Sequence, residues 1–102
     1  MSNSGYAFTP SAETDLAEIW RYVAEDNPKA ADRLEADIYE ACRMLAKRPE
    51  LGTKRPTWTD KPVRFWPVRL NYLIVYVPES TPLQILRVLN AARDVPRLLR
   101  DN

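Results

Sequence analysis

The residues of this sequence that could do chemistry are four arginines in its second half, which lie on or beside apolar segments. They are Arg64, Arg69, Arg87 and Arg93. A guanidinium stays charged and carries five N–H donors, so a cluster of them could hold a phosphate or a carboxylate by paired hydrogen bonds. RNA cleavage by such a cluster would also need a base, which would have to be a lysine or tyrosine with a lowered pKa.

A structural role is open for the same arginines. Arg87 interrupts the apolar segment Leu83–Leu89, where an unpaired charge would be costly. It would therefore need an acidic partner, which the helices of the first half could supply. Arg93 stands beside Asp94 and could bond this neighbour instead of a ligand.

The chain has few residues that could support other kinds of catalysis. The chain has no histidine, which excludes Ser-His-Asp and Cys-His nucleophiles and histidine-based metal sites, and its two glycines cannot form a phosphate-binding loop. Cys42, the only cysteine, falls on an apolar helical stripe where a small buried side chain is the default. Acidic pairs such as Asp15 and Glu18 have the spacing of solvated helix faces. We therefore predict no cofactor and no metal.

The charge of the chain is balanced in sum but uneven along its length. Lys+Arg 15 against Asp+Glu 14 gives a net charge of +1, so no global field indicates nucleic acid. Acids outnumber bases up to Glu50, and bases outnumber acids from Leu51 onward. Either the second half forms a basic surface, or the uneven charge reflects no more than acidic residues on the solvated helix faces of the first half.

Length and composition favour one folded domain over residues 1–102. The 45% of hydrophobic residues can build a core without disulfides or metal. Residues 1–5 are polar and too short for a signal peptide, and no apolar run approaches the roughly 20 residues that span a bilayer. We expect a cytoplasmic protein with no membrane partner.

Two amphipathic helices are predicted in the first half. Thr9 and Asn27 can cap them, and Pro10 and Pro28 can occupy their first helical positions. Apolar residues then recur with the helical period, and the second stripe stops before Pro49. Because almost nothing separates the helices, they should form an antiparallel hairpin.

Strand-like segments dominate the rest of the chain. A short first strand is expected at Tyr6–Thr9, before the helices. Three longer strands follow them: Pro62–Val68, which Pro67 restricts to an edge, Tyr72–Val77, buried on both faces, and Leu83–Leu89. Pro96 marks a break before a helical or frayed tail. The order β-α-α-β-β-β predicts an α+β fold in which an antiparallel sheet packs against the N-terminal helical hairpin.

Large aromatic side chains indicate an interface as well as a core. Phe65 and Trp66 are consecutive in a predicted strand and therefore point to opposite faces. If helices cover only one face of the sheet, one of the two is exposed or needs a partner. Trp20 and Trp58 complete this group, and large aromatics often anchor protein interfaces.

The order and spacing of these segments resemble the RelE/ParE family of bacterial toxins, and within it the ParE-type plasmid-stabilisation proteins of type II toxin–antitoxin systems. The resemblance runs from about Tyr6 to Leu99. It rests on Phe8-Thr9-Pro10-x-Ala12-x-x-Asp15-Leu16-x-x-Ile19-Trp20, Asn27-Pro28-x-Ala30-Ala31, Pro49-x-x-Gly52, Val63-Arg64-x-x-Pro67-Val68, Tyr72-Leu73-Ile74-Val75-Tyr76 and Ile85-Leu86-Arg87-Val88-Leu89-Asn90-Ala91-Ala92-Arg93-Asp94.

The resemblance implies a toxin held inactive by a cognate ParD-like antitoxin, a ribbon-helix-helix protein that binds DNA. The toxin would then reach DNA only indirectly, through the antitoxin. ParE-type members are understood to inhibit DNA gyrase, whereas RelE-type members cut mRNA on the ribosome. We expect antitoxin contacts at Trp58, Phe65, Trp66 and Trp20, and target contacts at Arg93, Arg64 and Arg69.

The sequence departs from the ribonuclease branch of this family. Leu73 stands where an arginine is common, and the tail Arg97–Asn102 has no tyrosine or histidine. Arg64 and, more loosely, Arg93 match basic residues of that branch, so they would be catalytic if the chain cut mRNA. Asn90 stands where many ParE-like members have histidine. The sequence thus favours a gyrase-binding toxin, with an mRNA endonuclease or a weakly toxic, antitoxin-binding co-repressor as alternatives.

Overall fold

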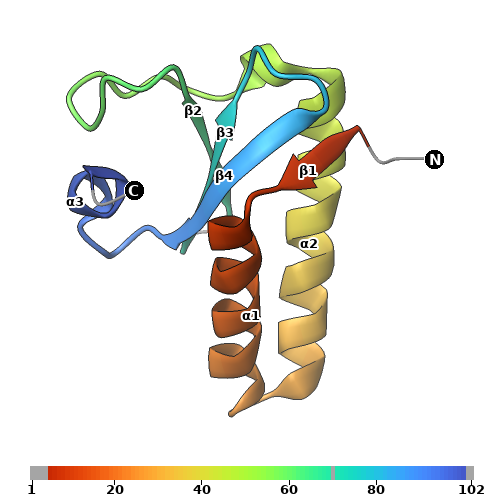
Figure 1. Ribbon diagram of the computed structural model, residues 1–102. Helices are drawn as coiled ribbons and strands as arrows, with labels where there is room; N and C mark the ends of the chain where they lie inside the picture. The colour runs from red at the N-terminus through yellow and green to blue at the C-terminus, as the bar shows by residue number, and fades with distance from the viewer. Residues whose placement is uncertain (1–4, 70, 101–102) are drawn as a thin grey trace.

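A helical hairpin and a four-stranded sheet form the body of the protein (Figure 1). The computed structural model describes residues 5–69 and 71–100. In chain order the elements are β1 (Tyr6–Phe8), α1 (Pro10–Ala24), α2 (Pro28–Lys47), the short 3-10 helix η1 (Pro49–Leu51), β2 (Arg64–Val68), β3 (Tyr72–Val77), β4 (Leu83–Asn90) and α3 (Val95–Arg100). No helix in this part of the chain is long and apolar enough to cross a membrane.

The helical hairpin begins where its capping residues predicted. The Thr9 hydroxyl accepts a hydrogen bond from the Ala12 N–H at 3.1 Å, and the Asn27 side chain accepts one from the Ala30 N–H at 3.1 Å. Each cap is followed by a proline at the start of its helix, where the missing N–H is not needed. The predicted antiparallel hairpin is therefore confirmed.

The sheet has the strand order β1-β4-β3-β2. Strands β2, β3 and β4 pair antiparallel, as predicted, but β1 pairs parallel with β4. The predicted α+β fold with its antiparallel strands is confirmed for β2, β3 and β4, whereas the parallel pairing of β1 was not predicted and makes the sheet mixed. No tight turn links β1 to its neighbour, because the chain leaves β1 through the helical hairpin, so local turn geometry does not fix its direction.

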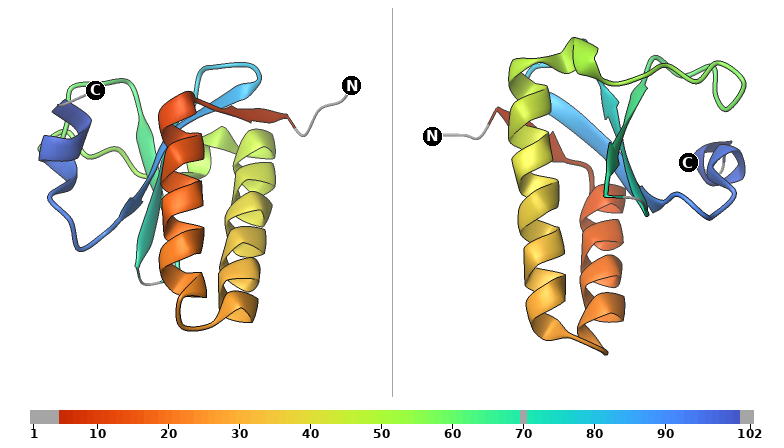
Figure 2. Two further views of the ribbon diagram at one scale, coloured as in Figure 1. Left: turned by 60° about the horizontal axis from the view of Figure 1, so that its bottom comes forward. Right: turned by 180° about the vertical axis from the view of Figure 1, so that it is seen from behind.

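Both faces of the sheet are covered, although by different elements (Figure 2). The helical hairpin packs on one face, and α3 with the irregular segment 53–63 packs on the other. Phe65 belongs to the second face and is only 1% exposed, while Trp66 is half-buried on the hairpin side. The condition under which one of these two rings would be exposed is not met, because α3 and segment 53–63 cover the second face.

Helix α3 includes Pro96, which we predicted to be a break. The helix begins at Val95, so Pro96 occupies its first turn. The Asp94 carboxylate accepts a hydrogen bond from the Arg97 N–H at 3.3 Å and so caps this end. Val95 and Leu99 are each 2% exposed and anchor the helix on the sheet.

The outer edge of β2 is closed. Phe65 exchanges two backbone hydrogen bonds of 2.9 Å with Thr53, which lies on the side of β2 away from β3. Pro67, two residues further on, faces the same side and has no N–H to offer. A further strand therefore could not accept a backbone hydrogen bond from Phe65 or Pro67.

No strand among the described residues pairs with the outer edge of β1. Gly5 and Thr9 make backbone hydrogen bonds to β4, of 2.9 and 3.1 Å. Alternate residues of a parallel strand face its partner, so the backbone groups of Tyr6 and Phe8 point away from β4. At this edge the backbone groups of Tyr6 and Phe8 therefore have no hydrogen-bond partner among the described residues.

Candidate functional site

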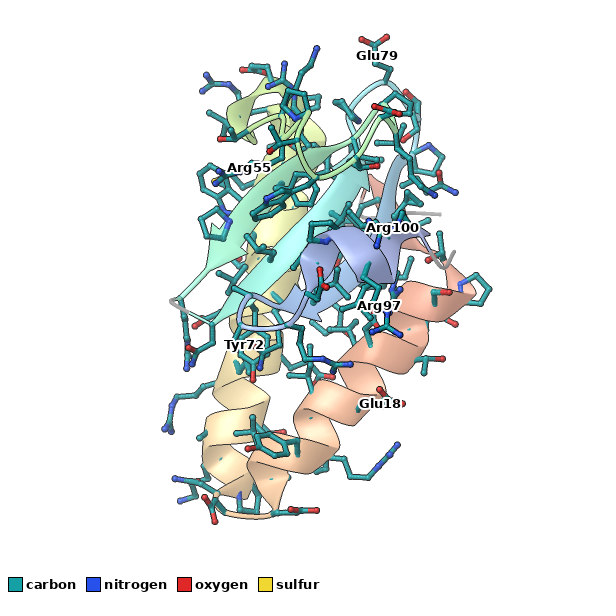
Figure 3. The ribbon with its side chains drawn as sticks, turned by 90° about the vertical axis from the view of Figure 1, so that its left-hand side faces the viewer. Glu18, Arg55, Tyr72, Glu79, Arg97 and Arg100 are labelled. Atoms are coloured by element: carbon teal, nitrogen blue, oxygen red, sulfur yellow. The ribbon has the colours of Figure 1, made fainter. Side chains whose placement is uncertain are left out.

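A groove of about 400 Å³ lies between α1, α3 and the ends of β3 and β4 where Tyr72 and Asn90 pair. Figure 3 marks two of its sides with Tyr72, on the sheet, and Glu18, on α1. Its lining combines charged and aromatic side chains: Asp15, Glu18, Tyr22, Tyr72, Arg87, Asn90 and Arg93. This is where the arginines near the end of β4 meet the helical hairpin.

The floor of the groove holds a nearly buried ion pair. The Arg87 Nε and Nη2 donate to the two carboxylate oxygens of Asp15 at 2.7 and 2.8 Å. The Val88 N–H donates to the same carboxylate at 3.0 Å. The hydrogen bond and charge of Asp15 raise the pKa of Arg87 above its ordinary value. These contacts confirm that Arg87 pairs with an acid of the helical hairpin.

Asp15 itself was missed by the sequence analysis, which placed it on a solvated face. It is 8% exposed and is the buried charged residue of the described chain. The spacing contained a signal, since Asp15 lies three residues after Ala12 and four before Ile19, on the apolar stripe of α1. An acid inside an apolar stripe and an arginine inside an apolar strand should have been matched to each other.

The rim of the groove carries Arg93 and Tyr22. The Asn90 side chain accepts a hydrogen bond from the Ala92 N–H at 2.8 Å, which shapes the turn that presents Arg93. The Arg93 side chain is exposed and makes no hydrogen bond or ion pair with any residue of the described ranges; the bond to Asp94 considered above is not formed. Tyr22, which sequence reasoning did not single out, is 74% exposed.

Arg64 and Arg69 do not join Arg93. Arg64 donates to the carbonyl of Gly52 at 2.7 Å, and Arg69 donates from two nitrogens to Asp37 of α2 at 2.8 and 2.6 Å. Strand register places Arg64 at the opposite end of β2 from the groove, a separation of roughly 13 Å along the strand. The arginines are therefore dispersed.

Three tyrosines and the cysteine, which could serve as bases, have pKa values shifted in the unfavourable direction. Burial raises the pKa values of Tyr39, Tyr72 and Tyr76, and it raises the pKa of the Cys42 thiol to about 12. The Tyr76 hydroxyl is also occupied, because it accepts from the Gly52 N–H at 2.8 Å and donates to the Pro49 carbonyl at 2.7 Å. Within the described residues, no group of three or more carboxylate or cysteine side chains could hold a metal ion.

Three of the four aromatic residues predicted to contact a partner make specific contacts within the chain, and the fourth, Trp66, packs against the hairpin-side core. Trp58 packs edge-on against Phe65, with ring centroids 5.3 Å apart, and Arg55 lies 4.9 Å from the centre of its ring. Trp20 donates from Nε1 to Asp32 at 2.9 Å and so links the two helices. Trp58, Trp66 and Trp20 remain partly exposed, whereas Phe65 does not.

Comparison with known proteins supports a single family. Residues 6–95, well over half of the chain, match the family described as ParE toxin of type II toxin-antitoxin system, parDE. A solved structure described as the chromosomal ParDE TA system from P. aeruginosa is similar, with a TM-score of 0.66 and 27% sequence identity. That similarity covers 83% of this chain and 92% of the other. No curated protein sequence gives a significant match. The fold and these matches confirm the resemblance: the chain belongs to the ParE toxin family of type II toxin–antitoxin systems.

Proposed function

We propose that this toxin acts by binding DNA gyrase and that a ParD-like antitoxin neutralises it. The main observation against RNA cleavage is that the arginines lie far apart. Arg64 is held by the Gly52 carbonyl at one end of the sheet, and Arg93 stands at the other. Two cations this far apart cannot both stabilise one phosphorus centre.

The acid–base chemistry of the chain supports the same choice. Cleavage of RNA without histidine needs a base whose pKa is lowered towards neutrality. The resolved shifts of Tyr39, Tyr72, Tyr76 and Cys42 are all upward, because burial disfavours their charged forms. A toxin that works by contact alone needs no such group.

The target contact is assigned to the rim of the groove. Arg93 is exposed and unpaired within the described residues, and Tyr22 supplies a large exposed ring on the facing helix. Tyrosine and arginine are common anchors of protein interfaces. Arg64 and Arg69 would have to give up Gly52 and Asp37 to reach a target, so we expect them to contribute less.

The antitoxin contact is assigned to the open edge of β1 and to the partly exposed tryptophans. The similar solved structure is described as a ParDE TA system, which supports a ParD-like partner. An extended antitoxin segment could add to the free backbone of Tyr6 and Phe8. Trp20, Trp58 and Trp66 are the candidate side-chain anchors; Phe65 stays a prediction that requires its cover to move.

The test uses purified toxin, purified gyrase and supercoiled DNA. We expect the toxin to trap gyrase–DNA cleavage complexes, and we expect Arg93→Ala with Tyr22→Ala to reduce trapping at least tenfold, as for the loss of two interface anchors. Arg33→Ala, an exposed arginine of α2 outside the groove, is the matched control and should trap like the parent chain.

Two outcomes would contradict the proposal. If expression without antitoxin stops translation and leaves mRNA cut at ribosomal A sites, the toxin is an endonuclease. If expression has no effect on growth while antitoxin binding is intact, the chain is a weakly toxic co-repressor. An SOS response with DNA damage is the result that we expect.

A further inference from the structure

The two sides of the molecule carry opposite charge. Residues 6–50, which include β1 and the helical hairpin, hold ten acids and six bases, a difference of −4. Among the described residues, the side formed by α3 and segment 53–63 holds two exposed acids, Asp60 and Asp94, against five exposed bases. We call these five the basic face: Lys54, Arg55, Lys61, Arg97 and Arg100. Figure 3 looks onto this side, and Arg55, Arg97 and Arg100 are labelled on it.

The cations of the basic face form no ion pairs within the described residues, although Arg55 also lies over the ring of Trp58. The four ion pairs found among the described residues use carboxylates of Asp15, Asp37, Glu40 and Glu50, all from the first half of the chain. None of these pairs involves the basic face. Its segment and helix are nevertheless held together by the shared apolar cluster that contains Trp58 and Leu99. The elements that carry these cations are therefore held in place by the core.

The composition of this face distinguishes between two kinds of anionic partner. A protein segment would need apolar anchors to bind with useful affinity. The large hydrophobic side chain that is largely exposed among the described residues, Tyr22, lies on α1 in the groove. On the side of the basic face, Trp58 is partly exposed but already packs against Phe65 and Arg55. Phosphate backbones require only cations and N–H donors, which this face supplies.

We infer that the basic face binds the phosphate backbone of nucleic acid directly. Duplex DNA carries one phosphate charge per about 1.7 Å of axis, so a face on a body of 36 × 35 × 22 Å can meet several phosphates at once. This differs from the expectation that DNA is reached only through the antitoxin. The inference concerns the toxin alone and holds whether or not gyrase is the target. If both hold, the face would contact DNA that gyrase carries.

The test is the salt dependence of nucleic-acid binding by antitoxin-free toxin. Fluorescence anisotropy of a labelled duplex of about 20 base pairs is measured between about 50 and 200 mM NaCl. Five phosphate contacts predict a slope of log K against log salt of about −4.5. Arg97→Gln with Arg100→Gln should make that slope shallower by about 2. An RNA of the same length, measured in parallel, decides which nucleic acid is preferred.

A matched control distinguishes an effect of the basic face from an effect of net charge alone. Lys29→Gln with Arg33→Gln removes the same charge from exposed positions of α2 and should leave the slope unchanged. A second variant, Lys54→Gln with Arg55→Gln, tests the other half of the face without touching α3. Circular dichroism of each variant checks that it is folded.

Three results would overturn the inference. They are no binding to DNA or RNA at the lowest salt, equal slopes for the face variants and the α2 control, and binding to poly-glutamate but not to nucleic acid. The gyrase assay above is read separately. A toxin that binds DNA but does not trap gyrase would refute the proposed target and leave the basic face intact.

Discussion

The two sides of the sheet are held by different kinds of interaction. On the hairpin side, polar groups cross the core: Arg87 bonds Asp15, and Tyr76 bonds the backbone of Gly52 and Pro49. On the α3 side the core is an apolar cluster, and the basic residues above it form no ion pair within the described residues. On the hairpin side the charged residues hold elements of the fold together. On the α3 side the charged residues remain available to bind a partner.

The largest expected effect comes from breaking the hairpin side. Asp15→Ala would strand the nearly buried Arg87 guanidinium and the Val88 N–H. We expect the free energy of unfolding to fall by about 3–5 kcal/mol, measured by urea denaturation. Asp37→Ala, which breaks the half-exposed pair with Arg69, is the control and should cost no more than about 1 kcal/mol. Equal losses would show that burial does not distinguish the two pairs.

A smaller effect is expected on the α3 side. Leu99 is 2% exposed, but it belongs to a helix of six residues at the end of the described chain, where neighbours can close a cavity. Leu99→Ala should therefore cost about 2 kcal/mol, near the low end for a buried leucine. Leu98→Ala, at a half-buried position of the same helix, should cost less. A loss as large as that of Asp15→Ala would show that α3 is fixed as firmly as the hairpin.

The smallest effect concerns the pH dependence of the hairpin-side core. Burial raises the pKa of Cys42 from 9.0 to about 12. The folded state therefore keeps the thiol protonated while the unfolded state releases its proton, so stability is complete below pH 9 and is lost as pH rises towards 12.

Between pH 9 and pH 10, Cys42 should contribute a loss of about 1 kcal/mol. Urea denaturation at both pH values should show this loss in the parent chain and not in Cys42→Ala. The same pH dependence in both proteins would mean that water reaches the thiol.

Local signals made the helical hairpin predictable. Thr9-Pro10 and Asn27-Pro28 each combine a side-chain acceptor with a proline that opens a helix, so a few adjacent residues determine each boundary. The strand Tyr72–Val77 was predicted with its observed bounds, because it is buried on both faces and its apolar run is continuous. In both cases the information lies within the element itself.

Features that depend on distant residues were harder to predict. The parallel pairing of β1 with β4 joins segments about 77 residues apart, and no turn specifies it. For Arg87, the kind of partner was predicted but not its identity, because Asp15 was assigned to a solvated face. The burial of Phe65 depends on α3, a short helix whose proline was interpreted as a break.

The unequal edges of the sheet limit how many chains can associate through backbone pairing. Because Thr53 and Pro67 close the edge of β2, one toxin molecule can pair with only one additional strand, at β1. Two toxins that met at their β1 edges would expose only closed edges, so growth would end at a pair. If the antitoxin segment pairs with this edge as proposed, self-association and neutralisation exclude each other at this position.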